Sequence, residues 1–206
     1  GLKYERGDSL ASNANFPFQP SSINLLILTH AHIDHSGNIP TLIKQGYSGK
    51  IICTEPTAAL VENLLNDSVN VQLIESKNRR KGKKGKYQDA KSLYGQKDVR
   101  NTLEHIAVLG FHKKLRISHE LTIEFYPAGH ILGAASVLLE VTENGVTKRI
   151  GFTGDLGQTG SKIVVDPEPM PNLDYLVSES TYGSRLHKST HSAEETLLEY
   201  IRKNCI

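Results

Sequence analysis

INLLILTHAHIDHSG, residues 23–37, joins an almost continuous apolar run to four side chains that commonly bind metal ions. The apolar run is short and rich in branched residues, which is typical of a β-strand buried on both faces. The four side chains follow directly at its C-terminal end: His30, His32, Asp34 and His35. The sequence therefore predicts a buried strand that delivers a set of ligating side chains to the edge of a sheet.

Strand and helix patterns alternate after this segment. The pattern predicts a helix over 36–44, a strand over 50–53 and a helix that starts at Thr54-Glu55-Pro56 and ends near Asn66. Another helix is predicted at 98–106. This alternation is typical of an α/β fold.

The second half of the chain is dominated by strand patterns. Apolar and polar residues alternate over 121–126, and the runs 136–141 and 146–152 flank Asn144-Gly145, a strong hairpin signal. The run 173–177 predicts a last strand. The complete pattern therefore predicts an α/β (α+β) fold.

A capping-box pattern predicts where the final helix begins. Ser192 is followed three residues later by Glu195, and Leu197, Leu198 and Ile201 give this helix an apolar side.

Composition excludes several classes of protein. The 206 residues are 38% hydrophobic and 22% charged, as in one globular domain, and a net charge of +2 is too mild to indicate nucleic acid by itself. No apolar stretch approaches the roughly 20 residues that span a bilayer, so no membrane partner is expected. The only two cysteines, Cys53 and Cys205, lie far apart, which excludes a disulfide framework and favours a cytoplasmic setting.

Further candidate ligands also follow predicted strands. His130, Asp155 and Glu179 each come just after an apolar run. Turns along one rim would hold their side chains rigidly while one coordination position stays open for water, as a catalytic metal centre requires. The histidines without this context are expected to be exposed or hydrogen-bonded: His105, His112, His119, His187 and His191.

The spacing suggests two metal ions. His30 and His32 are two residues apart in an extended segment and can share one ion, whereas Asp34 and His35 are better placed for a second. His130 would complete the first site, and Asp155 would bridge the ions, since an anionic oxygen offsets the repulsion between two cations. Imidazole and carboxylate ligands without thiolates favour Zn²⁺, with Mn²⁺ or Fe²⁺ as alternatives.

Longer motifs connect these residues to a known family. LTHAHIDHSG at 28–37 resembles the HxHxDH signature of the metallo-β-lactamase superfamily. Together with AGHILGAAS, FTGDLG and SESTYGSRLH, it is similar to the β-CASP branch of RNA-processing nucleases. This branch includes RNase J, the cleavage and polyadenylation endonuclease, and the bacterial and archaeal RNA exonucleases, which resemble the chain most.

The resemblance implies a domain organisation. Residues 1–190 would form a metallo-β-lactamase catalytic domain, an αββα sandwich that is incomplete because its N-terminal strands lie outside the chain. Residues 191–206 would be the first helix leading into a β-CASP cap domain, which also lies outside the chain.

The resemblance also implies roles for the site residues. His30, His32 and His130 would hold one zinc, Asp34 and His35 the other, and Asp155 would bridge them. Glu179 matches an acidic motif of β-CASP enzymes, where it supports a catalytic histidine that here lies outside the chain. Asp34 and Glu179 are therefore the expected catalytic residues.

The resulting hypothesis is a nuclease that acts on single-stranded RNA. A metal-bound hydroxide at a two-zinc site would attack an RNA phosphate, and Asp34 would help to orient the water. A small-molecule hydrolase of thioesterase or lactonase type is an alternative, because HxHxDH alone serves many substrates. A non-catalytic RNA-binding subunit is a second alternative, although every visible ligand position is filled. The sequence does not decide between an exonuclease and an endonuclease. A homodimer is possible, but the sequence does not decide the oligomeric state either.

A basic segment at 77–86 carries seven Lys and Arg residues and no acid. The sequence predicts an exposed loop that either contacts RNA phosphates, through Lys81, Lys83 and Lys84, or is simply solvated. Arg185 either reaches a substrate phosphate or pairs with an acid.

Overall fold

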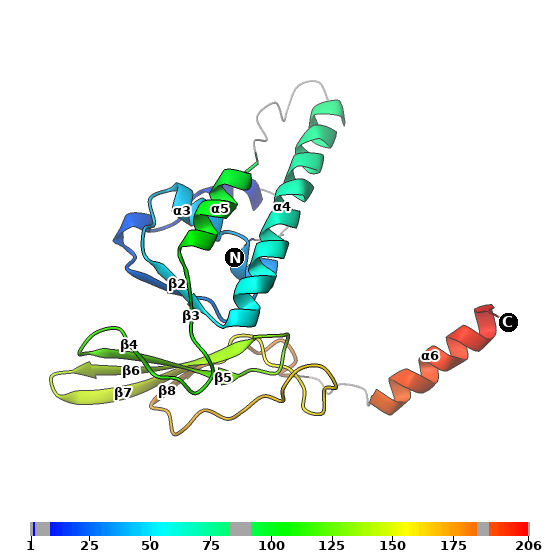
Figure 1. The fold of residues 1–206 in the computed structure, drawn as a ribbon. Helices are drawn as coiled ribbons and strands as arrows, with labels where there is room; N and C mark the ends of the chain where they lie inside the picture. Colours follow the sequence, from blue (N-terminus) through cyan, green and yellow to red (C-terminus); the bar gives the residue numbers. More distant parts are fainter. Residues whose placement is uncertain (1, 3–8, 83–91, 185–189, 206) are drawn as a thin grey trace.

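The described residues of the computed structural model, 2, 9–82, 92–184 and 190–205, form a layer of helices, a three-stranded sheet and a five-stranded sheet (Figure 1). The helices cover one face of the smaller sheet, and the larger sheet lies against its other face. The predicted α+β fold class is confirmed, with one helical layer among the residues described.

The three-stranded sheet is parallel, in the order β1 (Leu25–Ile27), β2 (Lys50–Cys53) and β3 (Ile106–Val108). Its covering helices are α3 (Ile39–Lys44), α4 (Glu55–Gly82) and α5 (Gln96–Glu104). Three short helices complete this half: α1 (Ser9–Ala14), the 3-10 helix η1 (Pro20–Ser22) and α2 (Ile33–Ser36).

Strand β2 shows how side-chain alternation builds the two cores. Ile51 and Cys53 belong to the core between this sheet and the helices, where Val61 and Leu65 of α4 are fully buried. Ile52 faces the opposite way and packs in the core between the two sheets. A parallel strand covered on both faces needs an apolar residue at every position, which explains the continuous apolar runs in the sequence.

The five-stranded sheet has the order β4 (Leu115–Arg116), β5 (Leu121–Pro127), β6 (Ala135–Glu143), β7 (Val146–Phe152) and β8 (Tyr175–Val177). Neighbouring strands are antiparallel except β7 and β8. Asn144 and Gly145 connect β6 to β7 with φ angles of 51° and 78°. Positive φ at both positions is the geometry of a type I′ hairpin turn, so the predicted hairpin is confirmed.

Several predicted boundaries are wrong. Helix α4 continues to Gly82 instead of ending near Asn66, so residues 77–82 are helical and not a loop. The physical reason is that no glycine or proline interrupts the chain between Pro56 and Gly82. The other basic positions of this segment, 83–86, lie outside the described residues.

Other elements differ by a few residues or were not predicted. The helix predicted at 36–44 is divided into α2 and α3, and β3 begins where the helix predicted at 98–106 was expected to end. Helix α6 (Thr190–Cys205) starts two residues before Ser192, so Ser192 lies inside the helix and not at its cap. In Figure 1, α6 stands apart from both sheets. Within the described ranges, no helix has a stretch that is both long and apolar enough to cross a membrane.

Candidate metal centre

The first two histidines follow the parallel strand β1. His30 is fully buried, and its Nε2 lies 3.2 Å from Nδ1 of His32. The hydroxyl of Thr29 lies 3.1 Å from the other ring nitrogen of His30. A proton on Nδ1 of His30 can thus be donated to Thr29, which leaves the Nε2 lone pair directed at the cluster.

His130 comes from the turn between β5 and β6. Its Nε2 lies 3.0 Å from His32 Nδ1. Gly129 precedes it at a φ of 68° and Gly133 follows at 77°, conformations that L side chains rarely adopt. The turn is therefore sharp enough to bring His130 back over the end of β1.

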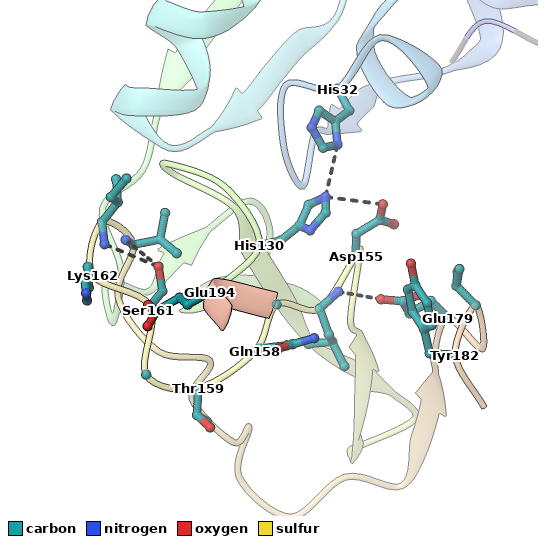
Figure 2. Close-up of a pocket in the computed structure, with 17 residues that line it drawn as sticks. His32, His130, Asp155, Gln158, Thr159, Ser161, Lys162, Glu179, Tyr182 and Glu194 are labelled. Carbon is teal, nitrogen blue, oxygen red and sulfur yellow. Dashed lines mark hydrogen bonds and ion pairs between the residues drawn. The ribbon is translucent and has the colours of Figure 1, made fainter. Parts of the chain in front are cut away.

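Asp155 follows β7 and completes the group. Its Oδ2 lies 3.6 Å from Nε2 of both His30 and His130, and Figure 2 shows the contact with His130. One ligand atom from each of these residues and from His32 falls within 4.8 Å of all the others. Around a tetrahedral Zn²⁺ with ligand distances of about 2.0–2.1 Å, ligand atoms are about 3.3 Å apart. The side chains are already near the separations that a single cation needs.

The remaining two predicted ligands, Asp34 and His35, lie next to the same group, and the His35 ring centroid is 4.2 Å from that of His30. Asp155 Oδ1 is 3.3 Å from His35 Nε2, and His35 Nε2 is 3.7 Å from an oxygen of Asp34. The structure therefore brings all six predicted ligands into one continuous set of contacts. Asp155 presents one oxygen to the His30 side and the other to the His35 side.

The environment keeps the buried imidazole neutral. Burial, and then the neighbouring rings of His35, His32 and His130, lower the pKa of His30 to about 3. Burial and the nearby His130 also lower the pKa of His32. Only an unprotonated nitrogen can bind a metal ion, so at neutral pH no proton competes for His30.

Glu179 holds the loop that carries Asp155. The backbone N–H of Leu156 donates to Glu179 Oε1 at 2.7 Å. This hydrogen bond, followed by one from the Thr181 hydroxyl, lowers the pKa of Glu179. The resulting carboxylate fixes the backbone immediately after Asp155.

A cavity of about 830 Å³ opens beside the cluster (Figure 2). Its wall includes His32, His130, Asp155 and Glu179, and it continues along residues 156–164. Lys162 is the one lysine or arginine among these described lining residues. The sequence offered only one signal for this loop, namely that it directly follows Asp155.

Of the predicted RNA contacts, only the backbone of Lys81 belongs to the described residues, and it lies far from this cavity. Position 81 is near the end of α4 that points away from both sheets, 24 residues beyond Thr57 at the helix start and so about 36 Å along the axis (Figure 1). Lys83, Lys84 and Arg185 lie outside the described residues.

Three histidines predicted to lie outside the site make local contacts. His105 Nδ1 lies 2.7 Å from the Gly49 carbonyl oxygen, and His112 Nε2 lies 3.2 Å from Glu168. His119 contacts Arg116. The expectation that these histidines are exposed or hydrogen-bonded is confirmed for all three.

Comparisons with known proteins agree with this geometry. A family model described as "Metallo-beta-lactamase superfamily" matches residues 7–199. Ribonuclease TTHA0252 of Thermus thermophilus is 29% identical over 97% of this chain and 41% of its own length. Endoribonuclease YSH1 of Gibberella zeae is 33% identical over 89% of this chain and 21% of its own length. An RNase J-like protein of Methanocaldococcus jannaschii is 31% identical over 87% of this chain and 37% of its own length.

The chain thus spans less than half the length of each of these relatives. Among solved structures, the subclass B3 metallo-beta-lactamase MEM-A1 from a soil metagenome library aligns with 66% of this chain and 43% of its own. Its TM-score is 0.41 and its identity 14%, values too low to add to the assignment.

Proposed function

Because this chain belongs to the metallo-beta-lactamase superfamily, we propose that it forms the metal-binding catalytic part of a ribonuclease that hydrolyses RNA phosphodiester bonds. The observation that carries this proposal is the convergence of His30, His32, His130 and Asp155 from two different sheets. The resemblance to β-CASP nucleases is confirmed by relatives that are named ribonucleases and endoribonucleases.

Two divalent cations fit the arrangement of ligands. His30, His32 and His130 would hold one, Asp34 and His35 the other, and the two oxygens of Asp155 face these two groups. The donor set favours Zn²⁺, with Mn²⁺ or Fe²⁺ as alternatives. Cations bound here would lower the pKa of a water molecule and stabilise the negative charge that develops on a phosphoryl oxygen.

The chain's own groups have separate tasks in this proposal. The low pKa of His30 keeps its ring available as a ligand. Asp34, whose side chain is 58% exposed beside His35, would accept a hydrogen bond from the attacking water and orient it. The Glu179 carboxylate would hold Asp155 in place through the Leu156 backbone.

The cavity gives the RNA a path across the site. We place the scissile phosphate over Asp155 and a neighbouring phosphate of the single strand along residues 156–164, where Lys162 supplies a positive charge. This path replaces the predicted contact through Lys81, which lies at the far end of α4.

The decisive experiment is Asp155→Asn in the full-length protein. It should abolish turnover of single-stranded RNA at saturating Zn²⁺. The loss of activity should exceed the roughly 10- to 100-fold that is typical when a residue that only supports a metal ligand is replaced. Asp174→Asn is the matched control, because Asp174 is an exposed carboxylate that pairs with Lys148 and lies outside the cluster.

Two results would contradict the proposal. Retained RNA cleavage by a correctly folded Asp155→Asn protein would remove the metal assignment. Wild-type protein that hydrolyses thioesters or lactones, but not RNA, would show that the small-molecule alternative is correct.

A further inference from the structure

The turn that carries His130 is held by two hydroxyl groups from the helical layer. Thr54 Oγ1 donates to the Gly133 carbonyl oxygen at 2.6 Å, and Thr57 Oγ1 donates to the same oxygen at 3.0 Å. Both threonines are buried, at 2% and 0% exposure. They lie at the start of α4, directly after β2, whereas Gly133 belongs to the connection between β5 and β6.

The hydrogen bonds of this group are mutually consistent. Thr54 Oγ1 also lies 3.0 Å from Thr57 Oγ1, a second acceptor for its one proton, but the Gly133 oxygen is nearer at 2.6 Å. With the Thr54 proton directed at Gly133, both hydroxyls donate to the two lone pairs of that carbonyl oxygen. The Thr54 oxygen also accepts from the Thr57 backbone N–H at 3.4 Å, which is a long capping bond at the start of α4. One threonine therefore caps the helix and binds the turn.

The geometry leaves little freedom for the turn to adjust. A Cβ on Gly133 would lie 2.6 Å from Thr54 Oγ1 and 2.6 Å from the Thr57 backbone nitrogen. On the other side of the turn, the Ala135 N–H donates to the Thr29 carbonyl oxygen at 2.9 Å, one residue before His30. The His130 turn is thus fixed both to the segment after β2 and to the segment after β1.

We infer that Thr54 and Thr57 are positioning residues for the metal centre, which act on His130 through the Gly133 carbonyl group. This inference rests on the proposed metal site. The two hydroxyls hold the turn in the position that brings His130 Nε2 within 3.0 Å of His32 Nδ1. Without both hydroxyls, the partly buried Gly133 carbonyl group loses these two donors, and the turn must move to find another.

The test measures Zn²⁺ affinity in the full-length protein, by competition with a chromogenic chelator. Thr57→Val keeps the shape of the side chain and removes its proton donor. We expect the Kd of the tighter Zn²⁺ site to rise about 10- to 100-fold, the usual effect of losing a group that orients a ligand. Thr57→Ser retains the hydroxyl and should bring the Zn²⁺ affinity back towards the wild-type value.

Thr102→Val is the matched control. Thr102 is also fully buried, and its hydroxyl donates to the Asp98 carbonyl oxygen within α5, away from the His130 turn. A variant that only loses a buried hydrogen bond should lower the Tm of the metal-free protein and leave the Zn²⁺ affinity unchanged. The pair therefore separates a positioning role from a structural one.

Unchanged Zn²⁺ affinity in folded Thr57→Val protein would overturn the inference. If this variant does not fold, Thr57→Ala removes the hydroxyl without adding a methyl group and is measured in the same way. The ribonuclease proposal is tested separately. Wild-type protein that binds Zn²⁺ but cleaves no RNA would refute that proposal. Weaker Zn²⁺ binding by Thr57→Val would still support the role of the two threonines.

Discussion

Cys53 ends strand β2 one residue before the Thr54 cap, in a fully buried position. Burial raises the pKa of its thiol to about 12. Because the thiolate is the reactive form, Cys53 should be inert in the folded protein and react with a thiol reagent at pH 8 only as fast as the protein unfolds. The measurement uses a Cys205→Ser background, and rapid labelling under native conditions would contradict it.

The same thiol makes stability depend on pH. The folded pKa is above the unfolded value near 9, so the stabilising effect is complete below pH 9 and is lost as the pH rises from 9 towards 12. At pH 10, ionisation of this thiol should stabilise the unfolded state by about 1 kcal/mol, an effect that Cys53→Ala protein lacks. Urea denaturation of both proteins at pH 7 and pH 10 measures this difference.

Most of the proposed ligand set could be predicted from single residues, because His30, His130 and Asp155 each come just after an apolar strand pattern. His30 and His32 also share a two-residue spacing that puts both on one side of an extended segment. Thr57 and Lys162 could not be predicted in the same way. Their relation to the site depends on contacts with segments more than 70 positions away, such as Gly133, or on the course of an irregular loop.

At the scale of elements, the His130 turn and the loop after Asp155 approach one another closely. The Gly157 N–H donates to the Ala128 carbonyl oxygen at 2.8 Å. A Cβ on Gly157 would lie only 1.7 Å from the Gly129 carbonyl oxygen, which is backbone and cannot rotate away. No side chain fits without separating the two segments.

Gly157→Ala should therefore destabilise the protein by about 2 kcal/mol or more, as overpacking against a rigid neighbour does. It should also weaken metal binding, because it displaces the turn that carries His130. Thermal unfolding and Zn²⁺ titration measure the two effects. Gly110→Ala is a suitable control, since a Cβ there makes only an ordinary contact, 3.7 Å from Lys113 Cγ, and should change neither stability nor metal binding.

Helices and strands could be predicted from the sequence where a clear sequence signal marks their ends. Strand β2 and the β6–β7 hairpin were predicted well because a cap and an Asn-Gly turn mark their limits. The end of α4 was predicted wrongly because its packing and its helix formation end at different places: Val69 is buried, whereas Ile74 is 58% exposed but still helical. Strand β3 was missed because three residues directly after a helix are too few to show a period.

At the scale of the whole molecule, RNA affinity should depend on the charge that lines the cavity. Lys162→Ala should reduce the slope of log K against log salt by about 0.7, the value for one phosphate contact on a single strand. Lys148→Ala is the control, because Lys148 already pairs with Asp174 and lines a different part of the surface. Equal slopes for wild type and Lys162→Ala would exclude the proposed path.

Removal of metal should lower the stability of the entire fold. A cation present at 100 times its Kd stabilises the native state by about 2.7 kcal/mol. For a domain of this size, chelation should then lower Tm by about 5–10 °C. Asp155→Asn should show a much smaller chelator effect in the same scanning calorimetry experiment, and an equal effect would place the stabilising ion elsewhere.

Several features of the whole protein stay predictions. They are the cytoplasmic location, the homodimer, the boundary at residue 190 and the role of α6 as the first helix of a cap domain. The exposed side chains of Leu197 and Ile201 on α6 give that helix an apolar side among the described residues.

The proposed ligands are divided between the two sheets: His30 and His32 follow a strand of the parallel sheet, and His130 and Asp155 follow strands of the mixed sheet. During synthesis, the ribosome releases the last strand of the first sheet well before β7 and β8 of the second. A nascent chain would therefore complete the proposed group of His30, His32, His130 and Asp155 only after both layers have met. Metal occupancy would then report that assembly is complete, so that an active molecule is also a correctly folded one.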